Sequence, residues 1–442
     1  MPTPPGARGL PLLGESLQFL RNPNDFANER WARYGPVFYS HMLGKPTVFM
    51  RGAEANHWIF SGEGKYLENE WSPAVRALLG PDCLAVIGGE SHKRRRRLFA
   101  PHFRRVGMDA CIPGIESVAR KHIRRWRTDA ELGPVAMVPR MRAAIFEIAA
   151  RYVLGDPSDL GAPLPEVSKA LEQFVDGLFV ALAVKIPGSK FAAATAARDK
   201  LNTLLEDLVM RRDSGGRRGP DVLSTMLEVR DESGEPLPRS TIVDELLLLL
   251  FAGHDTTVTA STNILYHLAK SPQAYAAIRD EQDTLEDPSF TLETIRSMTY
   301  LEAALKESMR LIPPIGGAFR VMLEDTNFAG FCMPKGWRIA VGPRAVHSDP
   351  QLYPDPERFD PSRWLDGGPE LPPFAYIPFG GGPRTCIGQH FAMLEMVVLQ
   401  ALFIRAFDWK LAPNQDLSFT QLPVPRPRSG LVLELSACQS FD

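Results

Sequence analysis

Hydrophobic and polar positions follow different periods along the chain. Residues 1–51 are rich in proline, and within them residues 35–50 (GPVFYSHMLGKPTVFM) alternate apolar and polar side chains around a Gly-Lys-Pro turn. This period of two predicts a pair of strands. From about residue 90 to residue 306, apolar side chains recur at steps of three and four, which predicts helices. The clearest of these helices are expected at 117–126, 141–155 and 240–270.

After Pro313 the pattern changes to short apolar runs separated by proline and glycine. Residues 321–342 predict paired strands, with turns at residues 329–330 and 334–336. A last helix precedes the C-terminal strand pattern at residues 431–435 (LVLEL). We expect the strands near the two termini to join one small sheet.

Helices outweigh strands in this pattern, and no change of composition marks a domain boundary. We therefore interpret the 442 residues as one mainly helical domain of the α+β kind. Its β-rich part is expected at about 1–60 and 313–442, and its helical part at about 90–310.

Composition and charge exclude several classes of function. A formal net charge of −2 gives the chain no general attraction to nucleic acid or to anionic membranes. The apolar run that begins at Leu246 is too short to span a bilayer, and the N-terminus lacks the pattern of a signal peptide or anchor. The five cysteines are scattered without a CxxC pair, which argues against a disulfide framework or a structural zinc site. We therefore expect a soluble cytoplasmic protein, and a monomer.

One cysteine has an unusual setting. Residues 379–391 (FGGGPRTCIGQHF) place Cys386 between a glycine-rich loop and the start of the last helix. Free backbone N–H groups and the positive end of the helix dipole favour a thiolate there, and so does nearby Arg384. Gly382 and Gly388 leave room for a flat cofactor beside the backbone. These features are compatible with a catalytic nucleophile, a redox sensor or a metal ligand.

The spacing within this loop resembles F-x-x-G-x-R-x-C-x-G, the haem-binding loop of the cytochromes P450. The match comprises Phe379, Gly382, Arg384, Cys386 and Gly388. The resemblance covers nearly the whole chain. It implies the cytochrome P450 fold, a helix-rich triangular prism with small β-sheets and with haem between an oxygen-binding helix and the helix after the cysteine loop. It also implies that Cys386, flanked by Phe379 and Arg384, is the axial ligand of the iron of haem b (iron protoporphyrin IX).

The helix expected at 240–270 contains residues that disfavour a buried helix. Gly253 costs about 1 kcal/mol in a helix interior. Asp255 is costly to bury unpaired, and threonine hydroxyls compete for backbone carbonyls. The sequence therefore predicts either a distortion within a continuous helix or a capped helix end at Gly253–Asp255. The apolar period that continues from Val258 to Leu268 favours the continuous helix.

This segment also resembles the oxygen-binding motif of the family, A/G-G-x-D/E-T. The motif falls on Ala252, Gly253, His254, Asp255 and Thr256. By this resemblance Gly253 leaves room for dioxygen, while Asp255 and Thr256 relay the protons that oxygen cleavage requires. His254 is at the variable position and is expected to be a packing or surface residue.

The family's E-x-x-R motif falls on Glu307 and Arg310, which are three residues apart on one helix face. As an exposed pair they would contribute only about 0–1 kcal/mol. The resemblance adds a third member, which we assign to Arg358 in residues 355–364 (DPERFDPSRW). A carboxylate shared by two buried guanidiniums is a structural lock, and we expect it to support folding and the haem pocket.

Residues 91–103 (SHKRRRRLFAPHF) form the most basic part of the chain. Such a run indicates a solvated helix face or a nucleic-acid patch. His92 and Arg96 are four residues apart and share one helix face. The resemblance assigns this pair to a haem propionate, with Arg320 and Arg384 as further partners. The other cations are expected to face partly outward and to receive an acidic electron donor, a ferredoxin or flavodoxin: Lys93, Arg94, Arg95 and Arg97.

The expected substrate pocket is apolar, which fits an apolar guest. Its candidate residues could also be ordinary core residues, Phe174 and Phe179 above all. Arg76 is a candidate partner for a substrate carboxylate. The candidates are Trp71, Arg76, Phe174, Phe179, Phe251, Ala252, Ile315, Gly316 and Leu422.

Residues 311–320, 246–257 and 372–382 most resemble the retinoic-acid-hydroxylating branch of the family and its cyanobacterial relatives. This implies a retinoid, an apocarotenoid or another terpenoid as substrate, while a fatty acid or a steroid remains open. The chain has no dinucleotide or iron–sulfur motif, so electrons from NAD(P)H must come through a partner.

The sequence thus predicts a haem-thiolate monooxygenase that hydroxylates a C–H bond with dioxygen. Two alternatives are a haem-thiolate isomerase or dehydratase, and a non-enzymatic haem sensor or terpenoid-binding protein. Neither needs the acid–threonine pair for proton delivery, so Asp255 and Thr256 argue against both.

Overall fold

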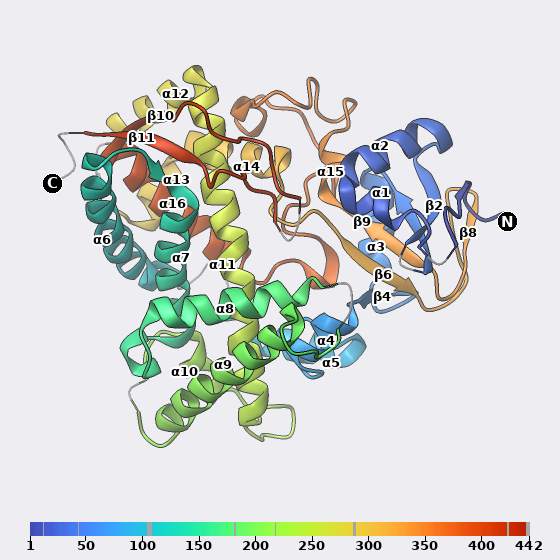
Figure 1. Cartoon of the computed structure of the whole chain (residues 1–442), viewed down its shortest axis with the longest axis horizontal. Helices are drawn as coiled ribbons and strands as arrows, with labels where there is room; N and C mark the ends of the chain where they lie inside the picture. The colour runs from blue at the N-terminus through green and yellow to red at the C-terminus, as the bar shows by residue number, and fades with distance from the viewer. Residues whose placement is uncertain are drawn as a thin grey trace.

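The computed structural model describes residues 1–11, 13–42, 44–103, 108–180, 183–216, 218–285, 289–421 and 424–438. A large helical part and a smaller β-rich part lie side by side, with the two ends of the chain on opposite sides of the molecule (Figure 1). Among the described residues, no helix is long and apolar enough to cross a membrane.

Helices make up most of the chain, as predicted. They are α1 (Ser16–Arg21), α2 (Pro23–Tyr34), α3 (Ala53–Gly62), α4 (Pro73–Leu79), α5 (Gly89–Phe99), α6 (Ile112–Glu131), α7 (Met137–Leu154), α8 (Leu164–Leu178), α9 (Lys190–Asp213), α10 (Val222–Glu228), α11 (Arg239–Lys270), α12 (Pro272–Asp283), α13 (Leu292–Ser297), α14 (Thr299–Leu311), α15 (Pro343–His347) and α16 (Gln389–Ala406). Four short 3₁₀ helices are described as well, η1 (Met108–Cys111), η2 (Pro157–Leu160), η3 (Pro361–Trp364) and η4 (Gly382–Arg384).

The strands form three sheets among the described residues. The largest has the order β1-β2-β3-β9-β6-β4, the second β10-β11-β5, and the third consists of β7 and β8. The strands are β1 (Gly6–Ala7), β2 (Val37–Met42), β3 (Lys45–Met50), β4 (Leu67–Glu70), β5 (Val135–Ala136), β6 (Ala318–Met322), β7 (Thr326–Phe328), β8 (Phe331–Met333), β9 (Arg338–Val341), β10 (Phe407–Leu411) and β11 (Val432–Ala437).

The strand pairs predicted from alternation are confirmed. β2 pairs with β3 in antiparallel register, with Phe38 opposite Phe49. β7 and β8 are joined at Ala329 and Gly330, which have φ of 50° and 80° as a tight hairpin turn requires.

The expectation that the terminal strands share one sheet is wrong. β1 pairs with β2 in the β-rich part, whereas β11 pairs with β10 and with β5 in the helical part. The reason is connectivity. β10 directly follows α16, and its open edge is the nearest one with which the C-terminal strand β11 can pair.

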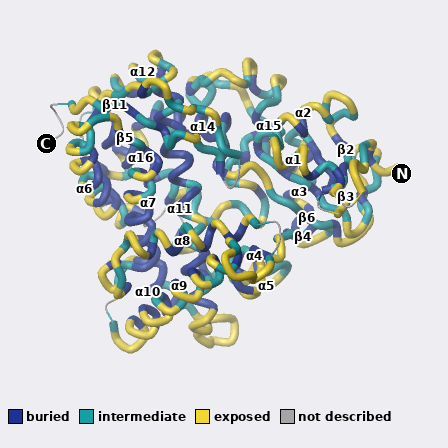
Figure 2. Tube along the Cα trace, in the orientation of Figure 1, coloured by how far each residue is buried: buried dark blue, intermediate teal, exposed yellow. Residues whose placement is uncertain are grey.

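The long helix α11 runs through the centre of the helical part and contacts α7, α9, α14 and α16. It is continuous over 32 residues, so the alternative of a capped end at residues 253–255 is wrong. Figure 2 shows α7 and α11 largely in the colour of buried residues. A helix that is apolar on most faces needs such a position, because only neighbouring helices can cover all of its sides.

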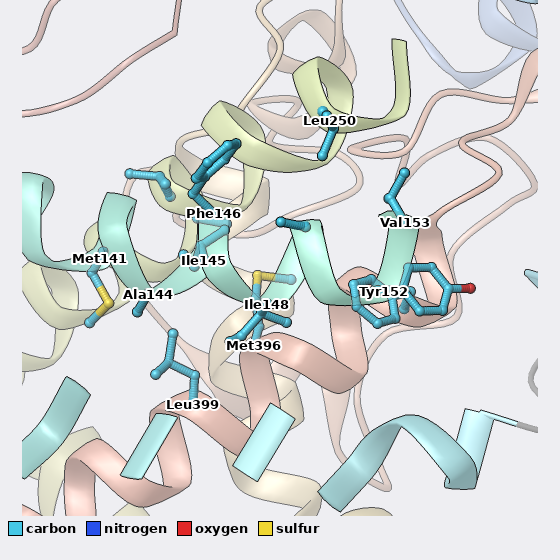
Figure 3. Packing of buried hydrophobic residues seen from close by; sticks show 14 of the residues in the cluster. Met141, Ala144, Ile145, Phe146, Ile148, Tyr152, Val153, Leu250, Met396 and Leu399 are labelled. Atoms are coloured by element: carbon cyan, nitrogen blue, oxygen red, sulfur yellow. The ribbon is translucent and has the colours of Figure 1, made fainter. Parts of the chain in front are cut away.

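The core between α7 and its neighbours is made of closely packed aliphatic and aromatic side chains. Figure 3 shows Ala144 and Ile148 of α7 near Met396 and Leu399 of α16, while Leu250 comes from α11. Ala144, Leu250 and Leu399 are fully buried. Each buried leucine or methionine stabilises the fold by about 1.5–3 kcal/mol relative to an exposed one. This packing fixes α16, and with it the loop that precedes α16.

A buried carboxylate joins α14 to the β-rich part. Glu307 accepts two hydrogen bonds of 2.8 Å from Arg310, and its Oε1 lies 3.3 Å from Nε of Arg363. Trp364 and the backbone N–H of Asp360 donate to the same carboxylate. Glu307 has no exposed surface, so its negative charge is stabilised by these donors alone.

Arg358 is not the third member of this lock, contrary to the sequence prediction. Its side chain is exposed, and only its backbone oxygen contributes, by accepting a bond of 3.2 Å from Arg310. The run PERFDPSRW contains two Pro-x-Arg-aromatic units five residues apart. The 3₁₀ turn of η3 directs the second arginine inward, and spacing alone did not distinguish the two.

His347 connects the lock to the segment before the cysteine loop. Its Nδ1 lies 3.1 Å from the backbone oxygen of Arg310, and its Nε2 accepts a bond of 2.9 Å from the N–H of Ile377. Burial lowers the pKa of His347 to about 3. The neutral ring is required here, because a protonated Nε2 would face another N–H group.

We predict that Arg363→Gln destabilises the protein by about 3 kcal/mol, because it leaves the buried carboxylate of Glu307 short of one cation. Arg358→Gln, at an exposed site, should change stability by no more than about 0.5 kcal/mol. Chemical denaturation of both variants measures the difference. Equal losses in the two variants would contradict the assignment of the lock to Arg363.

Candidate functional site

The cysteine loop is fixed by backbone bonds and by close packing on α3. The N–H of Cys386 donates to the oxygen of Phe379 over 2.9 Å, and that of Thr385 to Gly382 over 3.1 Å. Gly382 has φ of +65°, and a Cβ there would lie 2.7 Å from the backbone oxygen of Phe60. Gly382 is therefore needed for packing against α3, and not only for cofactor access as the sequence suggested. At Gly388 a Cβ would meet nothing within 4 Å, so this backbone does leave open space.

The thiol of Cys386 is accessible. The protein around the loop nevertheless raises the pKa of Cys386 by desolvation, while the N–H of Gly388 and the charge of Arg96 lower it. A backbone N–H group does favour the thiolate, as the sequence suggested, but in the protein alone desolvation has the larger effect. The cation that acts on the sulfur is also Arg96 rather than Arg384. A bound metal cation would supply the missing stabilisation of the thiolate.

One face of α11 borders open space although the rest of the helix is buried. Ala252 is exposed, Thr256 is half-buried, and a Cβ on Gly253 would meet nothing within 4 Å. The hydroxyl of Thr256 donates to the backbone oxygen of Ala252 over 2.7 Å. These are the residues of the predicted oxygen-binding motif, and they lie on the side of α11 where a ligand has room.

Asp255 is held by an arginine that the sequence analysis missed. Nη2 of Arg142, from α7, donates to Oδ1 of Asp255 over 3.0 Å, and Nη1 of Arg142 lies 3.2 Å from Glu172 of α8. No local motif marks Arg142, which stands more than a hundred residues before its partner. Its only signal is that it is one of three charged residues in the mainly apolar run at 141–155, with Glu147 and Arg151.

His254 is a packing residue and not a surface residue. It is buried, its ring centroid lies 5.2 Å from that of Phe146, and its Nε2 lies 3.3 Å from the backbone oxygen of Arg142. Burial lowers the pKa of His254 to about 4, so the ring is neutral at physiological pH.

The predicted propionate partners converge on one region beside the cysteine loop. His92 and Arg320 are buried, and Nη2 of Arg96 donates to the backbone oxygen of Thr385. Arg384 and Arg320 both donate to Glu63. Arg95, which we expected to face outward, instead donates to the buried Glu245 of α11 over 2.8 Å, so it belongs to the helix packing.

The substrate candidates differ in how far they are exposed. Ala252, Ile315, Gly316 and Phe179 are exposed, and Phe251 and Trp71 are half-buried. Phe174 is fully buried and meets Phe251 edge-on at 6.3 Å, so it is a core residue. Arg76 is exposed near the end of α4, and Leu422 lies outside the described residues.

The donor set fits the haem that the resemblance implies. It comprises an accessible thiol, open space beside Gly388 and Gly253, and a cluster of cations suited to two carboxylates. Cys386 would hold the iron, and Arg96, His92 and Arg320 would lie nearest the propionates.

A family model of cytochrome P450 matches residues 4–433. The chain belongs to the cytochrome P450 family. A putative cytochrome P450 120 from Synechocystis sp. is 36% identical, covering 98% of this chain and 97% of its own. A β-amyrin 28-monooxygenase from Saponaria officinalis is 33% identical, covering 98% of this chain and 91% of its own. Family membership makes the protein a haem-dependent oxidoreductase that uses dioxygen.

The fold agrees with a solved member of the family. The structure of a cyanobacterial CYP120A1 with retinoic acid bound superposes with a TM-score of 0.92 at 36% sequence identity, and covers 99% of this chain and 100% of the other. The predicted fold class, a mainly helical cytochrome P450 with small sheets, is confirmed.

We predict that Cys386→Ser abolishes the red-shifted Soret band that marks thiolate ligation in the reduced carbon-monoxide adduct. Serine is isosteric but gives a weaker, harder donor to iron. Cys438→Ser is the matched control and should leave this band unchanged. A red-shifted band that persists in Cys386→Ser would contradict the assignment of the iron ligand.

Proposed function

We propose that this cytochrome P450 hydroxylates a C–H bond of an apolar substrate, using dioxygen and two electrons from a separate redox partner. The observation that carries the proposal is the acid–alcohol pair on the open face of α11, where Thr256 is half-buried and Asp255 is tied to Arg142. When bound, the haem supplies the activation of dioxygen. The protein's own residues supply space, orientation and protons.

Thr256 and Asp255 have complementary roles in this proposal. The hydroxyl of Thr256 is oriented by its bond to Ala252 and presents its oxygen to the open space as an acceptor and relay. Asp255 shares Arg142 with Glu172. Because the guanidinium has a second carboxylate, Asp255 can turn toward Thr256 without leaving the half-buried Arg142 unpaired.

The substrate class that we favour is a retinoid, an apocarotenoid or another terpenoid. Exposed apolar residues at Ala252, Ile315 and Phe179 fit such a guest. The retinoic acid in the CYP120A1 structure and the β-amyrin of the plant relative are both terpenoid in chemistry. We further propose Arg76 of α4 as the partner of a substrate carboxylate.

The electron donor in this proposal is an acidic ferredoxin or flavodoxin that receives its electrons from NAD(P)H. Lys93, Arg94 and Arg97 are exposed on α5, the helix whose buried residues are His92 and Phe99. This exposed basic surface is smaller than the sequence suggested, because Arg95 is occupied by Glu245. A basic surface of this kind steers an acidic partner and gives association that weakens with salt.

We predict that Thr256→Ala keeps haem and substrate binding but uncouples the reaction, so that reducing equivalents are lost as hydrogen peroxide. Thr256→Ser should restore coupling, because it restores the hydroxyl. Product formed per NADPH, with a generic ferredoxin and its reductase, measures the effect. Coupling that stays at the wild-type level in Thr256→Ala would refute the relay. Turnover that needs no external electrons would instead favour an isomerase or dehydratase. Absence of any turnover would favour a haem sensor or a terpenoid-binding protein.

We predict that retinoic acid shifts the spin state of the ferric protein in a titration that includes fatty acids, steroids, carotenoid fragments and other terpenes. Arg76→Gln should weaken binding of retinoic acid by about 2- to 5-fold, the range of an exposed ion pair, and leave retinol unaffected. Equal losses for acid and alcohol would contradict the role of Arg76. A shift seen with fatty acids or steroids alone would contradict the terpenoid class.

A further inference from the structure

Two guanidiniums from distant parts of the chain share one carboxylate beside the cysteine loop. Glu63, at the end of α3, accepts a bond of 2.5 Å at Oε2 from Nε of Arg320 and one of 2.5 Å at Oε1 from Nε of Arg384. Arg320 belongs to β6, and Arg384 stands two residues before Cys386. Glu63 is 7% exposed and Arg320 is 6% exposed, so the contact is shielded from solvent.

A second carboxylate ties the same network to α5. Glu68 of β4 accepts from Nη2 of Arg384 over 2.9 Å at Oε1, and from the N–H of Gly89 over 3.0 Å at Oε2. Gly89 is the first residue of α5, the helix that carries His92 and Arg96. The four predicted propionate partners are therefore linked through Glu63 and Glu68, two residues that no sequence motif marked.

The bonds leave the two arginines with different free donors. Nε, Nη1 and Nη2 of Arg384 all have protein acceptors, which are Glu63, Glu68 and the backbone oxygens of residues 85 and 87. Arg320 uses Nε for Glu63 and Nη1 for Asn69 and its neighbouring backbone oxygen. Within the described part of the chain, Nη2 of Arg320 has no hydrogen bond. Arg320 therefore has a donor nitrogen available for an anion. Arg384 has none, and its bonds hold Glu63, Glu68 and the backbone at residues 85 and 87 together.

The charges of this region come close to balance without a ligand. Arg320 and Arg384 bond to Glu63 and Glu68, and Arg96 adds one further cation near Arg384. Desolvation together with Arg384 and Arg96 lowers the pKa of His92 to about 4, which leaves His92 neutral. A small cleft lined by Glu63, Glu68, His92, Lys93 and Arg384 opens beside the network. A group with two carboxylates that enters here adds negative charge next to that of Glu63.

We propose that Glu63 is a positioning residue for the haem. It orients the free donor of Arg320 toward the propionate site and fixes Arg384 beside it, and with haem bound its negative charge would lower the reduction potential of the iron. This inference rests on the proposed haem-thiolate function, but it concerns a residue outside the motifs of that function. The direction follows from Coulomb's law, because a nearby negative charge disfavours adding an electron.

The test is the Glu63→Gln variant, which keeps the shape of the side chain and removes its charge. We expect a positive shift of the ferric/ferrous potential that corresponds to an increase of roughly tenfold in the equilibrium constant for reduction, the size expected for one charge at a partly buried site. Loss of haem to apomyoglobin should also become about 10-fold faster, because both guanidiniums lose their shared acceptor. Glu54→Gln, an exposed glutamate at the other end of α3, is the matched control and should change neither value.

An unchanged potential in Glu63→Gln would overturn the inference, even if the variant were less stable, because a purely structural role lowers the unfolding temperature without moving the potential. If Glu63→Gln does not fold, Glu68→Gln serves as the test, since Glu68 shares Arg384. Its potential should shift in the same direction, and no shift would again overturn the inference. The carbon-monoxide spectrum of the wild-type protein distinguishes failure of the proposed function from failure of this inference. A missing thiolate band contradicts the proposed function. A normal band together with an unchanged potential in Glu63→Gln contradicts only the role of Glu63.

Discussion

The loop that holds the Cys386 sulfur is constrained from several sides, and the rest of the site depends on that constraint. Gly382 packs against Phe60 of α3, Arg96 of α5 donates to the oxygen of Thr385, and His347 accepts from the N–H of Ile377 shortly before the loop. The helix α16 that follows is fixed by the hydrophobic core of Figure 3. A metal ligand must be held to within a fraction of an ångström, and a glycine-rich loop achieves this only through its neighbours.

Desolvation opposes ionisation of the Cys386 thiol, whereas nearby donors and charges favour it. The N–H of Gly388 and the charge of Arg96 favour the thiolate but do not outweigh the surrounding protein. The protein therefore fixes the position of the sulfur, and a bound iron would supply the remaining stabilisation of the thiolate.

Shared buried carboxylates join distant segments of the chain at two places. Glu307 gathers Arg310 and Arg363 under the end of α14, and Glu63 gathers Arg320 and Arg384 beside the cysteine loop. Burying a carboxylate is costly, and each is stabilised because two guanidiniums converge on it, with two further donors at Glu307. Both networks bring together segments that are far apart in sequence, so each depends on the correct packing of those segments.

The sequence by itself determined the features that depend on short-range spacing. The residues from Phe379 to Gly388, the motif from Ala252 to Thr256 and the alternating strands at residues 35–50 each carry a local pattern, and these patterns predicted the helices, the hairpins and the family. Only the tertiary structure decided which charges meet. It placed Arg363 rather than Arg358 on Glu307, paired Asp255 with Arg142, and revealed Glu63 between two arginines. The physical reason is that such pairs depend on the direction in which distant segments present their side chains, and one sequence records no such contact between residues that are far apart in the chain.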